Sequence, residues 1–377
     1  MNKKIAVIGG GINGLCSAWL CAQQGFDVSV FEKETLMSQT SRCSSKLLHG
    51  GLRYLEFFQF SLVKESLQER KFWLDKAPEL TGKVELIIPI YKQGSRKRFE
   101  YKLGLMLYDF LAGKNNLGKH QYLSKEKVLD IFPNLKSEGL TGAYSYFDGR
   151  MDDYQLGLWV AEQIRDLGGK IQENTEVQYI TNDGRLTIKS KGASDSDKRL
   201  DKNLEQAIQF DCVVNACGPW AKDLVSRSSL NSHINLKLVR GTHIIIPRIS
   251  DKALYLEDTD SKRLFFVLPY KGNTLVGTTE RDQYIGDEIK PTEQEIDYLL
   301  NALNGNFSSK VNRDDVIDSF AGARPLIFDS SKGMNEVSRE YKIKVNNKLI
   351  NVFGGKWTTS RKLGESVLAE VLAIISN

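Results

Sequence analysis

Residues 4–32, KIAVIGGGINGLCSAWLCAQQGFDVSVFE, decide the fold class of this chain. Residues 3–9, with the apolar residues Ile5 to Ile8, predict a buried strand, and residues 26–31 predict another. Between them, residues 13–24 predict a helix with small residues along one side. This order of elements predicts a βαβ unit, and with it a parallel sheet of the α/β class.

The turn between the first strand and the helix carries the pattern G-x-G-x-x-G at Gly9, Gly11 and Gly14. Gly9 permits a tight turn, Gly11 lets the backbone approach a pyrophosphate, and Gly14 lets the helix pack close to the strand. The N–H groups at the helix N-terminus add hydrogen-bond donors and positive potential. The pattern therefore predicts a dinucleotide site, and the alternative is a glycine-rich turn with no ligand.

Glu32 ends the second strand, where dinucleotide-binding folds carry an acidic residue. Its carboxylate can accept hydrogen bonds from both ribose hydroxyls, and its charge would repel a 2′-phosphate. This repulsion argues against NADP as the ligand. The motif alone does not distinguish FAD from NAD.

Composition excludes several other classes of protein. The net charge of +5 is far from the footprint of a nucleic-acid-binding protein, and 41% hydrophobic against 26% charged residues argues against disorder. Five cysteines, an odd number with no C-x-x-C spacing, support neither a disulfide framework nor a metal site. We therefore expect a cytoplasmic protein of about two domains, with no secretory signal and no membrane span.

Later segments extend the architecture. Residues 210–215 predict a buried strand that runs into the turn at residues 216–220, and ligands bind at such carboxyl ends in open α/β sheets. Short alternating strands between residues 237 and 279 predict a separate, mostly antiparallel sheet. Residues 349–375 predict a strand, the pair Gly354-Gly355 and a closing helix.

Residues 8–14, IGGGING, and 44–56, SSKLLHGGLRYLE, resemble motifs of the FAD-dependent glycerol-3-phosphate dehydrogenases, a family within the glycine/D-amino-acid oxidase superfamily. The likeness covers essentially the whole chain. Further matching stretches are 149–153, 213–220, 241–247, 276–279, 322–325, 338–341 and 352–361. The usual bacterial members carry a further carboxyl-terminal helical domain beyond the match, so the chain resembles a short form of the family.

The resemblance implies an FAD-binding Rossmann-like domain interleaved with a mostly antiparallel β-sheet substrate or cap domain, α+β overall. The FAD-binding domain is expected to be discontinuous, over residues 1–85, 147–225 and 315–377. The substrate domain is expected over residues 86–146 and 226–314. The site is expected between the two.

The resemblance also implies which residues hold FAD. The hydroxyls of Ser44 and Ser45 would reach phosphate, and the backbone at Gly50 and Gly51 would lie against the flat ring. Amides after Gly354 would face the flavin pyrimidine and stabilise negative charge. The full expected set is Gly9, Gly11, Gly14, Glu32, Lys33, Ser41, Ser44, Ser45, Gly50, Gly51, Val177, Ala216, Gly218, Trp220, Gly322, Gly355 and Thr358.

A phosphorylated polyol substrate is implied by cations in the matched stretches. Arg53, Arg324, Arg339 and Lys356 stand at family positions associated with the substrate phosphate, and guanidinium forks suit a dianion. Each could instead form a surface ion pair. Tyr54 either hydrogen-bonds the substrate or walls the cavity.

His49 and His243 are the candidate catalytic bases, because they are the two of four histidines that fall in matched stretches. Neutral imidazole, with a pKa near 6.5, suits removal of a proton from a secondary alcohol. A structural role against the flavin is the alternative for each. The position of His243 on the predicted substrate-domain sheet favours His243.

The reaction implied by the resemblance is oxidation of sn-glycerol 3-phosphate to dihydroxyacetone phosphate by hydride transfer to flavin N5. Quinone, oxygen or a partner subunit would then reoxidise the flavin. Two alternatives stay open: oxidation of another anionic hydroxy compound or amine, and a non-catalytic FAD-binding subunit.

Residues 101–111 form an apolar segment flanked by Arg96, Lys97, Arg98 and Lys114. A core helix is the commoner explanation for such a segment. The alternative is a peripheral contact with the inner face of the cytoplasmic membrane, favoured by the flanking cations and by the family's delivery of electrons to membrane quinone.

Overall fold

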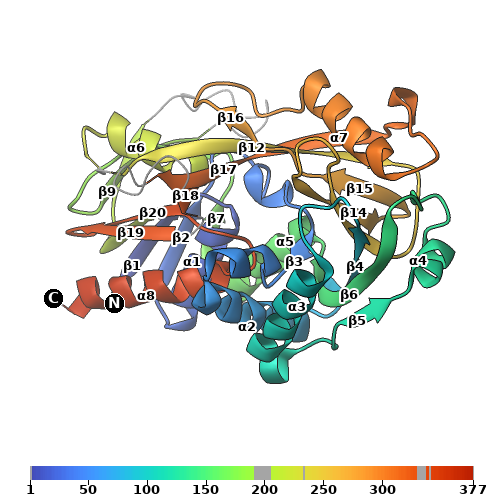
Figure 1. Cartoon of the computed structure of the whole chain (residues 1–377). Coiled ribbons are helices and arrows are strands. Elements are labelled where there is room, and N and C mark those ends of the chain that lie inside the picture. Colours follow the sequence, from blue (N-terminus) through green and yellow to red (C-terminus); the bar gives the residue numbers. More distant parts are fainter. Residues whose placement is uncertain (1, 191–204, 232–233, 329–336, 339–340, 377) are drawn as a thin grey trace.

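The computed structural model describes residues 2–190, 205–231, 234–328, 337–338 and 341–376 (Figure 1). The α/β fold class expected from the sequence is confirmed, with helices packed on two main sheets. None of the described helices is both long enough and apolar enough to cross a membrane.

A six-stranded sheet is built around the amino-terminal βαβ unit. Its strands, in spatial order, are β19 (Tyr341–Asn346), β20 (Leu349–Gly354), β11 (Cys212–Asn215), β1 (Lys4–Ile8), β2 (Asp27–Phe31) and β7 (Lys170–Gln172). Neighbouring strands pair in parallel except β19 with β20. β1 is buried on both faces, because Ile5 and Val7 pack in one core cluster and Ala6 and Ile8 in another, which explains its continuous apolar run.

Helices cover one face of this sheet. α1 (Ile12–Gln23), α5 (Asp153–Asp166) and α8 (Ser360–Ser376) pack in the cluster that holds Ile5 and Val7. The other face meets α6 (Ala221–Arg227) and a three-stranded sheet of β8 (Thr175–Ile180), β9 (Arg185–Ser190) and β10 (Gln206–Gln209). The strand–helix–strand order expected from residues 3–31 is confirmed.

The second, large sheet has eleven strands. Its path is β18 (Val337–Ser338), β17 (Asp318–Phe328), β12 (Leu236–Ile246), β15 (Asn273–Gly277), β14 (Leu264–Tyr270), β13 (Ala253–Glu257), β4 (Thr81–Tyr91), β6 (Leu140–Met151) and β3 (Leu47–Leu48), with β16 (Arg281–Gln283) beside β12 and β5 (Gln121–Leu123) beside β6. The described pairs in this sheet are antiparallel, apart from β13 with β4. The expected mostly antiparallel sheet is confirmed.

Two helix pairs cover the large sheet. α4 (Lys125–Ile131) and α7 (Glu293–Asn306) pack on one face, and α2 (Phe60–Lys76) and α3 (Arg98–Ala112) pack on the other. Figure 1 shows α7 above this sheet and α2 and α3 below it. The short 3₁₀ helix η2 (Leu52–Phe57) lies against α2 and α3.

Two of the expected domain boundaries cut through strands. β4 crosses the boundary expected between residues 85 and 86, and β6 crosses the one expected between residues 146 and 147. A continuous sheet therefore spans both expected domains on this side of the molecule. The division itself stays a prediction.

Candidate functional site

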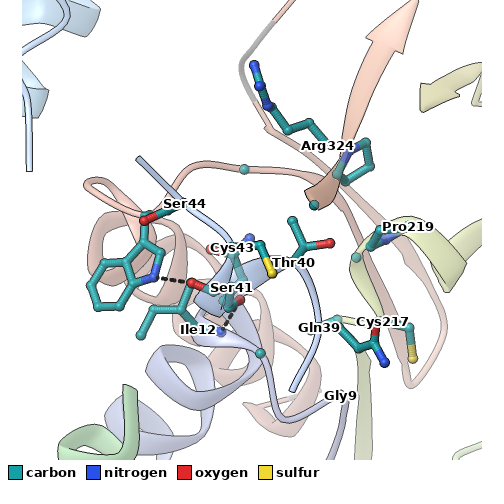
Figure 2. Close-up of a pocket in the computed structure, with 18 of the residues that line it drawn as sticks. Gly9, Ile12, Gln39, Thr40, Ser41, Cys43, Ser44, Cys217, Pro219 and Arg324 are labelled. Atoms are coloured by element: carbon teal, nitrogen blue, oxygen red, sulfur yellow. Dashed lines mark hydrogen bonds between the residues drawn. The ribbon is translucent and has the colours of Figure 1, made fainter. Parts of the chain in front are cut away.

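A cavity of about 690 Å³ lies where the two main sheets meet, at the carboxyl ends of β1, β2 and β11. This volume is within the range of about 300–1,000 Å³ that is usual for ligand sites. Figure 2 shows Gly9, Ser41 and Arg324 around this cavity, on three separate parts of the chain.

Most of the residues predicted to bind a ligand line the cavity. They are Gly9, Gly11, Glu32, Lys33, Ser41, Ser44, Ser45, His49, Tyr54, Val177, Ala216, Gly218, Trp220, His243, Gly322, Arg324, Gly355, Lys356 and Thr358. Gly14, Gly50, Gly51 and Arg53 are outside its lining, and Arg53 is exposed. Arg339 lies outside the described residues.

The glycine turn after β1 is required by close backbone contacts. Gly9 has a φ of +106°, and a Cβ on Gly14 would lie 2.0 Å from the carbonyl oxygen of Gly9. A Cβ on Gly11 would approach the Ser41 hydroxyl oxygen to 3.0 Å, and that oxygen accepts a hydrogen bond from the N–H of Ile12 (Figure 2). Gly14 therefore acts through packing, and Gly11 borders the open cavity.

Glu32 lies at the cavity wall and is anchored by the backbone. Its carboxylate accepts hydrogen bonds from the N–H of Gly10 at 2.6 Å and of Glu34 at 2.9 Å. Burial raises the pKa of Glu32, and these two donors oppose the rise. A carboxylate has about four acceptor sites, so Glu32 retains capacity for the hydroxyls of a ribose.

A second set of backbone donors comes from the end of the chain. Gly354 and Gly355 follow β20 with φ values of +79° and +103°, and the first turns before α8 include buried Thr358. A Cβ on Gly355 would lie 2.4 Å from the side-chain nitrogen of Asn13 in α1. The two glycine-rich turns of the sequence, one near each end, therefore meet at this cavity.

Ser44 and Ser45 line the cavity, but both hydroxyls have protein partners. Ser44 Oγ donates to a carboxylate oxygen of Asp153 at 2.6 Å. Ser45 Oγ and His243 Nε2 are 2.9 Å apart. Because the Ser44 hydroxyl proton is already donated to Asp153, this hydroxyl is less available to bind phosphate than the sequence suggested.

His243 is 2% exposed and held on three sides. Its ring stacks on Phe320 with centroids 5.0 Å apart, and a Cβ on Gly277 would come within 2.3 Å of it. Its Nδ1 is buried without a hydrogen-bond partner in the described part of the chain. Burial and the charges of Arg324 and Lys46 lower the pKa of His243 well below its usual value, so the ring is neutral.

Arg324 and Lys356, both predicted to bind the substrate phosphate, are among the cations that line the cavity. Arg324, on β17, donates to Thr278 Oγ1 at 3.0 Å, and its guanidinium lies 3.8 Å from a carboxylate oxygen of Glu280. The ammonium of Lys356 lies 4.1 Å from the ring centroid of Tyr54, a cation–π contact. Together they provide positive charge for an anionic ligand.

Sequence reasoning missed two aromatic residues at this site. Trp357 lines the cavity and donates from its indole N–H to the carbonyl oxygen of Ser41 at 3.0 Å. Phe320 supports His243. Trp357 lies in a stretch that resembles the family, so its position carried a signal, whereas Phe320 is recognisable only from the pairing of β12 with β17.

The cavity fits FAD better than a metal. Its wall combines a ribose acceptor, N–H groups at the start of α1 and a second glycine turn before α8, and the glycines leave room where Cβ atoms would intrude. Within the described ranges, no three His, Cys, Asp or Glu side chains gather as a metal site requires. The five cysteines are free thiols.

Comparison with known proteins agrees with this chemistry. Residues 4–365 match the family described as FAD dependent oxidoreductase. The glycerol-3-phosphate dehydrogenase of Pseudomonas tolaasii is 36% identical over 385 residues, which cover 97% of this chain and 71% of that protein. The D-erythritol 1-phosphate dehydrogenase of Brucella abortus is 36% identical over 369 residues, covering 95% and 71%.

The fold is also similar to a solved structure with FAD bound. The glycerol-3-phosphate dehydrogenase of Bacillus halodurans, complexed with FAD, superposes with a TM-score of 0.78 at 26% identity. The match covers 100% of this chain and 65% of that one, so the chain spans about two thirds of its length. The expected resemblance and the expected cofactor are confirmed.

Proposed function

This chain belongs to the FAD-dependent oxidoreductase family, and from that premise we propose that it oxidises sn-glycerol 3-phosphate to dihydroxyacetone phosphate. The observation that carries the proposal is one cavity in which Arg324 and Lys356, His49 and the FAD-type glycine turn at Gly9 all line the wall. Cations, a proton acceptor and a cofactor site together suit oxidation of a phosphorylated alcohol.

The residues that would hold FAD come from both ends of the chain. Glu32 would accept from the ribose, the N–H groups at the start of α1 would face the pyrophosphate, and the turn at Gly355 would face the ring system. Bound FAD supplies the hydride acceptor for the reaction. The other residues that were expected to bind FAD and that line the cavity would form the rest of its wall.

Arg324 and Lys356 would bind the substrate phosphate. Arg324 presents a planar fork that is already oriented by Thr278, and Lys356 adds a point charge beside Tyr54. Arg53 is exposed and outside the cavity lining, so its contribution to phosphate binding is the weakest part of the sequence prediction. Arg339 stays a prediction from the family resemblance.

His49 is the better candidate for the base. It is partly exposed and lines the cavity, so its imidazole has access to a substrate hydroxyl. His243 is 2% exposed and its Nε2 is hydrogen-bonded to Ser45, so it would receive a proton through that hydroxyl. Because of this burial we prefer His49, whereas the sequence favoured His243.

A longer polyol phosphate is the second candidate substrate. The relative named D-erythritol 1-phosphate dehydrogenase is as similar in sequence as the one named glycerol-3-phosphate dehydrogenase, at 36% identity each. Both substrates share a phosphate and a secondary alcohol, so the same cations and base would serve both.

Anaerobic mixing of the purified yellow protein with each compound tests the proposal. Bleaching of the flavin by sn-glycerol 3-phosphate, faster than by erythritol phosphate and much faster than by glycerol, supports it. Preference for erythritol phosphate would favour the second candidate. Bleaching by dithionite but by none of these compounds would favour another substrate or a non-catalytic FAD-binding subunit.

We also propose that α3 contacts a membrane surface. Its buried stripe of Leu105, Tyr108 and Ala112 packs in the core, while the opposite stripe is exposed at Phe99, Leu103, Met106 and Phe110. Phe57 and Phe58, at the end of η2, are exposed as well. Exposed lysines accompany the helix, at Lys97, Lys102 and Lys114. An apolar face with flanking cations suits attachment to anionic lipid, next to a quinone acceptor.

Sedimentation with lipid vesicles tests this contact. Vesicles that contain phosphatidylglycerol should bind the protein, and Phe110→Ser should weaken binding about tenfold, because burial of one aromatic side chain is worth about that much or more. Tyr284→Ser is the matched control, since Tyr284 is also exposed but lies directly after β16 and not on α3. Equal binding by all three proteins would contradict the proposal.

A further inference from the structure

Residues 149–153 resemble the family, yet neither the cofactor nor the substrate assignment uses them or the preceding Asp148. The stretch 148–153 runs from the end of β6 into the start of α5. β3 pairs with this end of β6, with Leu47 opposite Arg150 and Leu48 opposite Gly149. The stretch therefore lies alongside residues 44–50, which line the cavity at Ser44, Ser45 and His49.

The first of two buried clusters, the Asp153 cluster, consists of Asp153, Lys46 and Ser44. Asp153 is 1% exposed, and one of its carboxylate oxygens accepts from Ser44 Oγ at 2.6 Å and from the Ser44 N–H at 3.2 Å. Lys46 Nζ donates to the two oxygens at 2.8 and 2.9 Å, and also donates to the carbonyl oxygen of Arg42. The Asp153 cluster holds the beginning of the segment formed by residues 44–50.

The second, the Asp148 cluster, consists of Asp148, Arg70, Tyr108 and Gly50. Arg70 Nη1 lies 2.8 Å from Asp148, with both side chains almost fully buried, and the Tyr108 hydroxyl donates to the two carboxylate oxygens at 2.8 and 3.0 Å. The N–H of Gly50 donates to Tyr108 Oη at 2.9 Å and to Asp148 at 3.2 Å. The Asp148 cluster holds the end of residues 44–50, at Gly50.

The Asp148 cluster leaves no room for a side chain at Gly50. A Cβ there would lie 2.4 Å from Tyr108 Oη and 2.5 Å from a methyl group of Leu67. Arg70 comes from α2, Tyr108 from α3 and Asp148 from β6, so three elements meet at the carboxylate that accepts from the Gly50 N–H. His49, directly before this amide, is thereby held at the cavity wall.

Two buried ion pairs on one short segment are hard to explain by stability alone. Burying charges costs desolvation energy, and apolar residues of similar volume often stabilise a core as well or better. A role in fixing geometry accounts for them, since charge-assisted hydrogen bonds to backbone N–H groups are strong and directional.

We infer that Asp148 and Asp153 are positioning residues that hold the two ends of segment 44–50, and so keep Ser45 and His49 in the geometry required for oxidation. The inference rests on the proposed function, which gives these two side chains their roles. We therefore expect that replacing either carboxylate leaves FAD bound but slows flavin reduction by the substrate.

Asp148→Asn and Asp153→Asn test the inference in the holoprotein, with Asp152→Asn as the matched control. Asp152 is the adjacent carboxylate and caps α5 by accepting from the Gln155 N–H at 3.2 Å, a role that Asn performs equally well. Flavin reduction by sn-glycerol 3-phosphate should slow about tenfold or more in the two cluster variants, with KM within twofold of wild type. The control should match wild type.

Hydrogen exchange provides a readout that needs no substrate. The N–H groups of Ser44 and Gly50 donate to the two carboxylates, so exchange in a peptide spanning residues 41–51 should accelerate about tenfold in each variant, with FAD content and dithionite reduction unchanged. If wild-type flavin is not reduced by sn-glycerol 3-phosphate, the proposed function fails while exchange still tests the positioning.

Tyr108→Phe provides a milder variant if Asp148→Asn does not fold, with Tyr146→Phe as its control. Tyr146 packs edge-on against Tyr108 in the same core, with ring centroids 5.9 Å apart. Tyr108→Phe should accelerate exchange at Gly50 and Tyr146→Phe should not. Unchanged exchange and an unchanged rate in the cluster variants, or equal effects in the controls, would overturn the inference.

Discussion

The side-chain amide of Asn13 donates a hydrogen bond of 3.3 Å to the carbonyl oxygen of Gly354, which joins α1 to the end of β20. The N-terminal glycine turn and the C-terminal glycine pair therefore form one cofactor cavity, although most of the sequence separates them. Both turns require glycine for close packing: a Cβ at Gly14 would lie 2.0 Å from the carbonyl oxygen of Gly9, and a Cβ at Gly355 would lie 2.4 Å from the side-chain nitrogen of Asn13.

Gly14→Ala should abolish flavin binding, because the new Cβ would lie 2.0 Å from the carbonyl oxygen of Gly9 and would push α1 away from β1. Gly11→Ala should have a smaller effect, since its Cβ would meet only the Ser41 hydroxyl at 3.0 Å. Flavin absorbance per protein measures both. Gly104→Ala is the control, because no atom lies within 4 Å of a Cβ at that position. Full flavin content in Gly14→Ala would contradict the account.

Arg324→Ala should raise the KM for sn-glycerol 3-phosphate about ten- to a hundredfold, the usual cost of a lost charge-assisted contact. The KM for unphosphorylated glycerol should change little, because the missing partner is the phosphate. Arg324→Lys should give an intermediate value, since it keeps the charge but loses the fork. Equal losses on both substrates would assign Arg324 to the scaffold, through its hydrogen bond with Thr278.

His49→Asn should slow anaerobic flavin reduction about a hundred- to ten-thousandfold while FAD and substrate still bind, as expected for loss of a general base. His243→Asn should have a smaller effect, because His243 contacts Ser45 and is 2% exposed. The larger effect in His243→Asn would restore the preference suggested by the sequence. Rates within threefold of wild type in both variants would exclude imidazole as the base.

The free energy of unfolding should fall as the pH drops below about 6.5, the value expected for histidine in the unfolded chain. The folded-state pKa of His243 lies well below this value because the ring is buried near Arg324 and Lys46. The unfolded state therefore binds the extra proton first, at a cost to stability of about 1.4 kcal/mol per pH unit from this residue. Urea unfolding of wild type and His243→Asn between pH 7.5 and 5 measures the difference. Parallel curves would contradict it.

The βαβ unit and its glycine turn were predictable from the sequence, because strand, helix and turn signals there are local and agree with one another. The antiparallel sheet was predictable for the same reason. The apolar segment around α3 carried both a core and a surface interpretation, and each describes one face of the helix: Leu105 and Tyr108 are buried, while Leu103 and Phe110 are exposed.

The two positioning clusters were not predictable, because their partners are far apart along the chain. Asp148 meets Arg70 and Gly50, and Asp153 meets Ser44 and Lys46, at separations of 78 to 109 positions along the chain. A buried carboxylate has the same sequence signal as an exposed one until its partners are known. For the same reason the burial of His243 could not be foreseen from its motif.

Hydride transfer from sn-glycerol 3-phosphate to the flavin can be tested directly. The measurement is the rate of anaerobic flavin reduction by substrate that carries hydrogen or deuterium on carbon 2. We expect complete bleaching by both isotopic forms of the substrate and a clearly slower rate with deuterium, because the bond between carbon 2 and this atom breaks as hydride leaves. Absence of bleaching, or bleaching at the same rate with both substrates when chemistry limits reduction, would contradict this expectation.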